Sequence, residues 1–290
     1  MIKLVLSDMD DTLIPAGAPR VSARAIEAIH AAQAAGVHFG PVSGRQPDAM
    51  GWMFPENPEC YATGAFCNGQ VMIVDGDVVD AKPLDNEALM RLATFLEEET
   101  DDTFLKVYDL GADFRHSTSY CVTADAARVD AAMGSGSNAW LNEGAPNRFG
   151  VDDVAHYKAN IWSTRTTEEL AQLRVRMDEV APELAYVFPN NHARLFDILP
   201  MGWNKGSAVA VIARALGVGM DEVAVFGDSD NDLPMIETVP NAVAMGNAND
   251  RVRAAARWHI GDAADEAEAD ALLDIARAAT AGTMPTFMSA

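Results

Sequence analysis

Residues 5–13 of the chain read VLSDMDDTL. The apolar run at 2–6 predicts a short buried strand, and acidic residues follow it directly. Side chains alternate faces along a strand, so Asp8 and Asp10 would project on one side if the strand continued. Two carboxylates on one side repel each other unless a cation or a proton offsets their charge. The stretch therefore predicts either an ordinary acidic turn or the beginning of a charged reactive site.

Three further polar clusters come at or just after the ends of predicted elements. Ser43-Gly44 follows an apolar run, Asn204-Lys205 opens a predicted helix, and GDSDND at 227–232 follows a buried strand. Short apolar runs that alternate with helices predict a parallel sheet, and ligands bind beyond the carboxyl ends of such strands. Each cluster by itself is weak evidence for a site, but their order and settings together indicate one.

The 290 residues suffice for two domains. Between residues 83 and 192 the pattern changes to helices that alternate with paired strands, and the earlier pattern returns at Lys205. We therefore predict an α/β fold, a doubly wound parallel sheet built from residues 1–82 and 193–290. The inserted residues 83–192 are predicted to form a separate α+β domain.

The charge balance limits the partners of the protein. Lys and Arg total 21 and Asp and Glu total 43, which gives a net charge of −22. Such a field repels nucleic acid and anionic membranes. It would also repel a phosphorylated substrate, so a site for one needs local positive charge or a metal. No apolar run reaches about 18 residues, so no membrane span is expected.

The cysteines and histidines show no spacing typical of a metal site. The three cysteines, Cys60, Cys67 and Cys121, are odd in number, and reduced thiols are the simplest account. The six histidines are scattered along the chain. The first residues do not resemble a signal peptide. We expect a cytoplasmic protein that is a monomer or a homodimer.

The four polar clusters resemble the motifs of the haloacid dehalogenase superfamily of phosphatases. Within it, the sequence is similar to the Cof-type hydrolases that carry a C2B cap. The motifs match in order at 8–13, 43–45, 205–206 and 227–232. Asn68-Gly69 and the run AMGNA at 244–248 add to the resemblance, which covers most of the chain and is weakest at 134–153 and 261–270. The implied architecture is a catalytic core with an inserted cap.

The resemblance implies a Mg²⁺-dependent phosphatase for a small phosphorylated metabolite, with sugar phosphates as the expected class. Asp8 would attack phosphorus and form an aspartyl-phosphate. Asp10 would protonate the leaving oxygen and later take a proton from the attacking water. Oxygen ligands suit Mg²⁺, and the implied set is the carboxylates of Asp8 and Asp228 with the backbone carbonyl of Asp10.

The remaining motif residues have expected supporting roles. Donors to the phosphate would come from the backbone N–H of Met9, the hydroxyl and amide of Ser43, the amide of Gly44, the ammonium of Lys205 and the side chain of Asn231. Asp232 would contact Lys205 or a water on the metal rather than the metal itself. Arg45 is expected to brace its own loop.

Other functions stay open at this point. A phosphomutase of the same superfamily would return the phosphate to a sugar, and a silent binder would hold a phosphorylated ligand without reaction. A dehalogenase is disfavoured, because Asp10 supplies a proton-transfer group that a carbon–halogen bond does not need. The run GSGS at 134–137 lacks the Gly-Lys-Ser/Thr ending of a phosphate loop, so a cap loop is predicted there.

Overall fold

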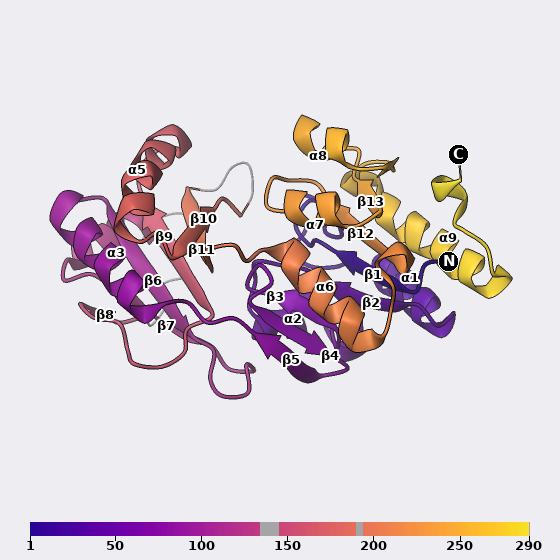
Figure 1. The fold of residues 1–290 in the computed structure, drawn as a ribbon, viewed down its shortest axis with the longest axis horizontal. Coiled ribbons are helices and arrows are strands. Elements are labelled where there is room, and N and C mark those ends of the chain that lie inside the picture. The colour runs from indigo at the N-terminus through magenta and orange to yellow at the C-terminus, as the bar shows by residue number, and fades with distance from the viewer. Residues whose placement is uncertain (134–144, 190–193, 290) are drawn as a thin grey trace. The chain divides into compact units, whose positions relative to one another are not determined.

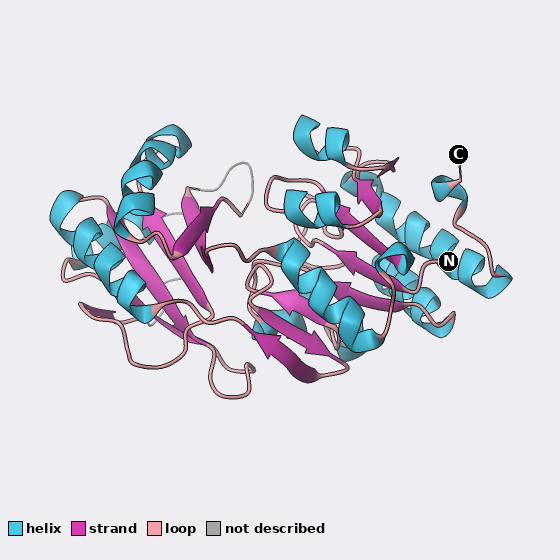
Figure 2. Cartoon of the chain, viewed as in Figure 1, coloured by secondary structure: helices cyan, strands magenta, loops and turns pink. Residues whose placement is uncertain are grey.

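The computed structural model describes residues 1–133, 145–189 and 194–289. The chain forms two compact units, one of Met1–Ala81 with Asn204–Ala290 and the other of Lys82–Trp203. Figure 2 shows the helices and strands of both units. The loop predicted at 134–137 and the predicted boundary at 192 lie outside the described residues.

The first unit contains a parallel sheet and a smaller antiparallel one. Its elements are β1 (Leu4–Ser7), α1 (Ala23–Ala34), β2 (His38–Pro41), α2 (Met50–Met53), β3 (Gly64–Phe66), β4 (Val71–Val74), β5 (Asp77–Ala81), α6 (Lys205–Leu216), β12 (Val223–Gly227), α7 (Leu233–Thr238), β13 (Asn241–Ala244), α8 (Asp250–Ala255), β14 (Trp258–His259) and α9 (Ala267–Ala281). The parallel sheet has the order β14-β13-β12-β1-β2, and β3, β4 and β5 form the antiparallel sheet.

Helices cover both faces of the parallel sheet. Helix α7 lies on one face against β12 and β13, with α6 packed beside it and against β3 and β4, while α1 and α9 pack together on the other face (Figure 1). Every residue of β1 and of β12 is buried as a result. Strands enclosed on both faces are apolar along their whole length, which is why these runs carry no alternating pattern. The predicted doubly wound α/β fold is confirmed.

The local signals place most element ends close to the prediction. Ser22 caps α1, because its side chain accepts a hydrogen bond from the Ala25 amide at 3.0 Å. The sequence from Cys60 to Phe66 is typical of one short strand, but only its second half forms one. The 3₁₀ turn η2 (Pro58–Cys60) ends at Cys60, and β3 begins only at Gly64. None of the helices in the described ranges is long and apolar enough to cross a bilayer.

The second unit is an α+β unit, as predicted for this part of the chain. Its elements are α3 (Asn86–Glu99), β6 (Thr103–Asp109), β7 (Thr118–Val122), α4 (Ala126–Met133), β8 (Asn147–Arg148), β9 (Lys158–Ser163), α5 (Thr167–Val180), β10 (Leu184–Val187) and β11 (Leu195–Pro200). The sheet order is β10-β11-β9-β6-β7-β8. The unit runs to Trp203 because β11 pairs with β9 and β10. The residues of β11 were predicted to belong to the doubly wound core.

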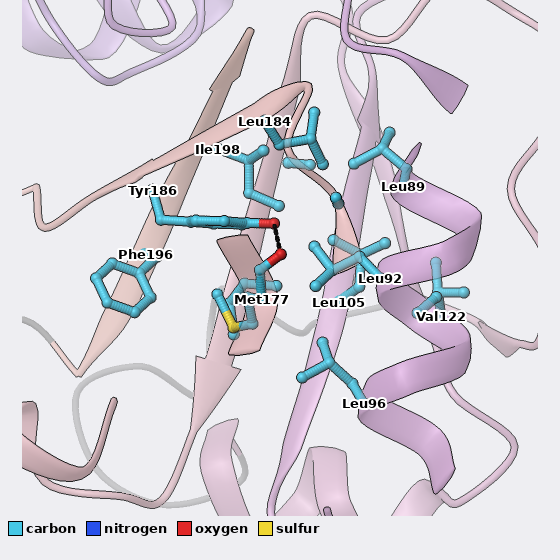
Figure 3. Close-up of a cluster of buried hydrophobic side chains, with 14 of the residues drawn as sticks. Leu89, Leu92, Leu96, Leu105, Val122, Met177, Leu184, Tyr186, Phe196 and Ile198 are labelled. Carbon is cyan, nitrogen blue, oxygen red and sulfur yellow. Dashed lines mark hydrogen bonds between the residues drawn. The ribbon is translucent and has the colours of Figure 1, made fainter. Parts of the chain in front are cut away.

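Apolar side chains of α3, α5 and the sheet form the core of the second unit. Figure 3 shows Leu89, Leu92 and Leu96 of α3 directed toward the strands. The Tyr186 hydroxyl lies in this core and donates to the backbone oxygen of Met177 at 3.5 Å. A buried hydroxyl thereby keeps a partner, as the burial of a polar group requires.

Candidate active site

The polar clusters that follow β1, β2 and β12 lie at one edge of the parallel sheet, because these three strands are neighbours. The parallel register pairs Ser7 of β1 with Phe226 of β12 and with Pro41 of β2. Asp8 therefore emerges beside the end of β12, and its amide donates to the Phe226 oxygen at 3.0 Å. Because all three strands run in the same direction, residues that follow them meet at the carboxyl edge.

Lys205 joins two buried carboxylates at this edge. Its Nζ lies 2.5 Å from Oδ1 of Asp8 and 2.6 Å from Oδ1 of Asp232. The exposed fractions are 1% for Lys205, 6% for Asp8 and 0% for Asp232. Residues separated by almost 200 positions thus form a chain of charges away from solvent. A buried charge of this kind is tolerated only when it is paired and hydrogen-bonded.

The close packing of α6 against α7 helps to place Lys205 at the site. Lys205 is the first residue of α6, and its N-cap Asn204 accepts a hydrogen bond from the Ser207 amide at 3.0 Å. A Cβ at Gly206 would lie 2.3 Å from the Pro234 carbonyl oxygen. Any larger residue at 206 would push α6 away from α7, and the Lys205 ammonium would move with it.

Asp232 has partners for both of its carboxylate oxygens. Oδ1 contacts Lys205, and Oδ2 accepts from the backbone amides of Asp228 and Ser229, each at 3.0 Å. A Cβ at Gly227 would lie 2.7 Å from the Cβ of Asp232, so glycine leaves the space that this carboxylate fills. Asp232 therefore holds the turn and Lys205 in place.

Asp8, Asp228 and Asp232 form a group whose oxygens lie within 4.8 Å of one another. Asp228 also accepts a hydrogen bond from the Thr12 hydroxyl at 3.0 Å. When ionised, the three carboxylates carry more negative charge than the Lys205 ammonium offsets. Carboxylate oxygens are the ligands that hard divalent cations prefer, and Mg²⁺ is commonly bound through one or two of them. The donor set thus fits Mg²⁺. Asp8 and Asp228 are the better candidates for ligands, because each accepts fewer hydrogen bonds than Asp232 does.

Burial, and after it the charges of the neighbours, shifts the pKa values of the group. Burial, with the neighbouring Asp232 next in size, raises the pKa of Asp228 to about 7. Burial also raises the pKa of Asp8 well above its usual range, and Asp232 adds to the shift while Lys205 opposes it. Burial disfavours the charged form of Lys205, but the carboxylates of Asp232 and Asp8 outweigh it and raise the lysine pKa. A bound cation would reverse the shifts of the acids.

Asp10 is bound by Arg45, a contact that sequence reasoning missed. Nη2 of Arg45 lies 2.8 Å from Oδ1 of Asp10, and Nε lies 3.2 Å from Oδ2. Such a two-pronged contact fixes the orientation of a carboxylate. The side chain of Arg45 was expected to brace its own loop, but it reaches across to the turn after β1. No spacing in the sequence points to this pair, because the two residues follow different strands.

The predicted phosphate donors are distributed along the same edge, with one correction. The amide of Ser43 donates to the Ala65 carbonyl at 2.8 Å, so it is not a phosphate donor in this structure. The Ser43 hydroxyl accepts from the Arg45 amide at 3.1 Å and keeps its own hydrogen for another acceptor. Ser43 was taken to offer both groups because the sequence cannot show that β3 lies beside it.

Met9, Gly44 and Asn231 also lie in the turns after β1, β2 and β12. Met9 is fully buried, and its carbonyl accepts from the Ile14 amide at 2.7 Å. The amide oxygen of Asn231 accepts a hydrogen bond from the Ser229 hydroxyl at 2.7 Å. These three residues therefore follow strands that end at the carboxyl edge. Their individual roles toward a phosphate stay predictions.

Glu268 is a buried acid near the site that the sequence did not reveal. It lies in the first turn of α9, is 2% exposed, and neither carboxyl oxygen has a hydrogen-bond partner among the described residues. The Ser7 hydroxyl donates instead to the Asp8 carbonyl oxygen at 2.7 Å. Burial raises the pKa of Glu268 to about 8, and the neighbouring Ser7 opposes this shift. At neutral pH the carboxyl is therefore mainly protonated.

Replacing Glu268 with Gln is expected to increase stability at alkaline pH. An acid whose pKa rises from 4.5 in the unfolded chain to about 8 in the fold destabilises the fold progressively between those pH values. The neutral Gln removes this term, so the gain over wild type should grow from pH 5 to pH 8, up to a few kcal/mol. Urea unfolding at pH 5, 6.5 and 8 measures it. The exposed Glu237→Gln variant is the control, and a gain that does not change with pH would contradict the assignment.

Comparison with known proteins gives three relevant similarities and one family match. A family model described as haloacid dehalogenase-like hydrolase matches residues 5–272. A Haemophilus influenzae protein with a provisional assignment as a phosphatase is 26% identical over 261 residues, which cover 88% of this chain and 91% of that protein. The HMP-PP phosphatase of Citrobacter koseri is 36% identical over 94 residues, which cover 32% of this chain and 34% of that protein.

Among solved structures, the HAD subclass IIB sugar phosphatase BT4131 has a similar fold. The TM-score is 0.71 at 19% sequence identity, and the match covers 93% of this chain and 97% of that one. At this level of identity the likeness shows a shared fold over almost the whole length of both chains.

Proposed function

Because the chain belongs to the haloacid dehalogenase-like hydrolase family, we propose that it is a Mg²⁺-dependent phosphatase for a small phosphorylated metabolite. One observation carries the proposal, namely the buried contact of Lys205 with Asp8 and Asp232 at the carboxyl edge of a parallel sheet. A carboxylate held beside an ammonium group and a second acid, Asp228, is the arrangement that phosphoryl transfer to an aspartate needs.

Asp8 is proposed to be the nucleophile. One of its oxygens forms a bond to phosphorus while the bond from phosphorus to the leaving oxygen breaks, which produces an aspartyl-phosphate. Lys205 offsets charge on the phosphate and on Asp8 throughout. When bound by the carboxylates of Asp8 and Asp228 and the carbonyl of Asp10, Mg²⁺ would offset the charge of the phosphate and keep both acids ionised.

Asp10 is proposed to move the protons of both steps. It gives a proton to the leaving oxygen, and it later takes one from the water that cleaves the aspartyl-phosphate. Arg45 holds both Asp10 oxygens in the structure, so Asp10 must release at least one of them when it donates a proton. Arg45 is thus a positioning residue that keeps the acid–base group oriented between turnovers.

Replacing Arg45 with Ala is expected to lower kcat about 10- to 100-fold while KM changes much less. The loss of the two-pronged contact leaves Asp10 without a fixed orientation, and general acid–base catalysis contributes 10²–10⁴-fold in enzymes. Steady-state phosphate release measures it, and added guanidinium should restore part of kcat. Arg251→Ala, which removes an exposed partner of Asp230, is the control. A change confined to KM would instead make Arg45 a substrate ligand.

Sugar phosphates are the proposed substrate class. The similarity to a sugar phosphatase and to an HMP-PP phosphatase supports phosphorylated small molecules in general, and the sugar class among them. We assign the selection of the substrate to the Lys82–Trp203 unit, which has its own core and corresponds to the inserted domain predicted from the sequence.

A panel of phosphorylated metabolites, assayed for phosphate release with Mg²⁺ and with chelator, tests the proposal. We expect release from at least one sugar phosphate that requires Mg²⁺ and stops on chelation. Tight binding of the panel without any release would make the protein a phospho-ligand binder. Activity that survives complete removal of divalent ions would overturn the mechanism, and transfer between sugars without free phosphate would make the protein a mutase.

A further inference from the structure

A second set of metal-ligand side chains lies in the first unit, on elements other than those of the catalytic edge. His30 comes from α1, and Glu59 and Cys60 come from the turn η2. One ligand atom of each lies within 4.8 Å of the others. Among residues 1–133, 145–189 and 194–289, this is the one such group that contains nitrogen, oxygen and sulfur donors. We propose that His30, Glu59 and Cys60 form a site for Zn²⁺ or a similar borderline cation.

The distances in the group agree with a tetrahedral ion. Zn²⁺ binds imidazole nitrogen at about 2.0–2.1 Å and thiolate sulfur at about 2.3 Å, which separates the two donors by about 3.6 Å at a tetrahedral angle. Nε2 of His30 lies 3.5 Å from Sγ of Cys60. Oε1 of Glu59 lies 2.9 Å from the same nitrogen and would have to move outward by about half an ångström. Its side chain is about half exposed and can make that adjustment.

The hydrogen bonding of the three groups also favours a cation. A ring nitrogen carries at most one hydrogen, and Nε2 faces both the Glu59 carboxylate and the Cys60 sulfur. A hydrogen on Nε2 can serve only one of the two, and the carboxylate oxygen at 2.9 Å is nearer than the sulfur at 3.5 Å, so the sulfur is left with a weak contact. A cation at the centre would accept lone pairs from all three donors. On binding, the Cys60 S–H proton leaves to solvent and a bond from sulfur to the ion replaces it. The neutral His30 ring then carries its one hydrogen on Nδ1, so that the lone pair of Nε2 binds the ion.

The donors are held on ordered backbone, and the site has access to solvent. The Gln33 side chain donates to the Glu59 carbonyl at 2.8 Å, which ties η2 to α1. The Cys60 amide donates to the Asn57 carbonyl at 3.1 Å. Cys60 is buried, whereas the side chains of His30 and Glu59 are 40% and 51% exposed. An ion could therefore enter from the solvent side, where a water would supply the fourth ligand of a tetrahedral set.

Titration of the reduced full-length protein with Co²⁺, in excess Mg²⁺, tests the site. Mg²⁺ occupies oxygen sites such as the catalytic acids, and only a thiolate ligand produces a sulfur-to-cobalt charge-transfer absorption band. We expect one equivalent of Co²⁺ to produce this band at micromolar or lower free metal, and Zn²⁺ to displace it. The band should vanish in Cys60→Ser and His30→Gln and weaken in Glu59→Gln. Glu56→Gln, in the same loop, should leave it unchanged.

Two further measurements keep the result independent of folding and of the proposed phosphatase activity. The His30 side chain is 40% exposed, so His30→Gln should keep the wild-type melting temperature without metal and lose the increase that Zn²⁺ produces in the wild type. Asp8→Asn should keep the full charge-transfer band, because the catalytic acids are not part of this site. A band that survives Cys60→Ser, or binding seen only at millimolar metal, would overturn the proposal.

Discussion

Replacing Asp8 with Asn is expected to lower kcat/KM for phosphate release by on the order of 10⁴-fold or more. The amide has the shape of the carboxylate and can still accept a hydrogen bond from Lys205, but it is too weak a nucleophile to form the aspartyl-phosphate. The measurement is phosphate release with saturating Mg²⁺ on the best substrate of the panel. An effect of this size separates the removal of the reacting group from the loss of one supporting contact.

The fold of the Asp8→Asn variant should be at least as stable as that of the wild type in the absence of Mg²⁺. Burial and the neighbouring Asp232 raise the pKa of Asp8, so its charge disfavours the folded state until a cation is bound. Urea unfolding without divalent ions measures this. Asp230→Asn, which removes an exposed acid paired with Arg251, is the matched control and should keep its activity. Residual Asp8→Asn activity within ten-fold of wild type would remove Asp8 from the role of nucleophile.

Replacing Lys205 with Met is expected to lower kcat/KM by about 10²–10³-fold and to destabilise the fold by about 3–5 kcal/mol. Met has a similar length without the charge, so Asp8 and Asp232 would stay buried without their shared cation. Removal of one partner of a buried ion pair costs more than the pair itself contributes, because the remaining charge is left uncompensated. Urea unfolding without Mg²⁺ and phosphate release with Mg²⁺ measure the two effects.

The double variant Lys205→Met with Asp232→Asn distinguishes lost charge balance from lost packing. It restores part of the balance, so it should be more stable than Lys205→Met and still lack activity. The surface pair of Lys3 with Glu222 provides the comparison, and Lys3→Met should cost less than about 1 kcal/mol. A Lys205→Met protein with wild-type stability would show that its carboxylate neighbours are protonated and that the charge chain is not formed in solution.

The fold class and the site segments could be predicted from the sequence because both depend on local order. Apolar runs alternating with helices specify a parallel sheet, and a parallel sheet brings the ends of its strands to one edge. Asp8 and Asp228 needed only that rule to be placed together. The resemblance carried by the four motifs is confirmed by the family match over most of the chain. The roles assigned to individual site residues stay predictions.

Contacts between loops could not be predicted in the same way. Arg45 reaches Asp10 because the turns after β2 and β1 are neighbours, and the amide of Ser43 donates to Ala65 because β3 lies beside it. The burial of Glu268 could not be predicted either, because a glutamate in the first turn of a helix is usually exposed. The pairing of β11 with β9 and β10, which makes β11 part of the second unit, likewise joins strands that are separated in the sequence.

The sequence by itself determined which segments become strands and helices, and hence which polar residues end at the carboxyl edge. Only the tertiary structure decided which distant side chains meet, as the contact of Arg45 with Asp10 and that of His30 with Cys60 show. The physical reason is the separation along the chain of the residues that interact. Secondary structure follows from residues a few positions apart, whereas these pairings depend on angles and distances that packing sets between distant parts of the chain.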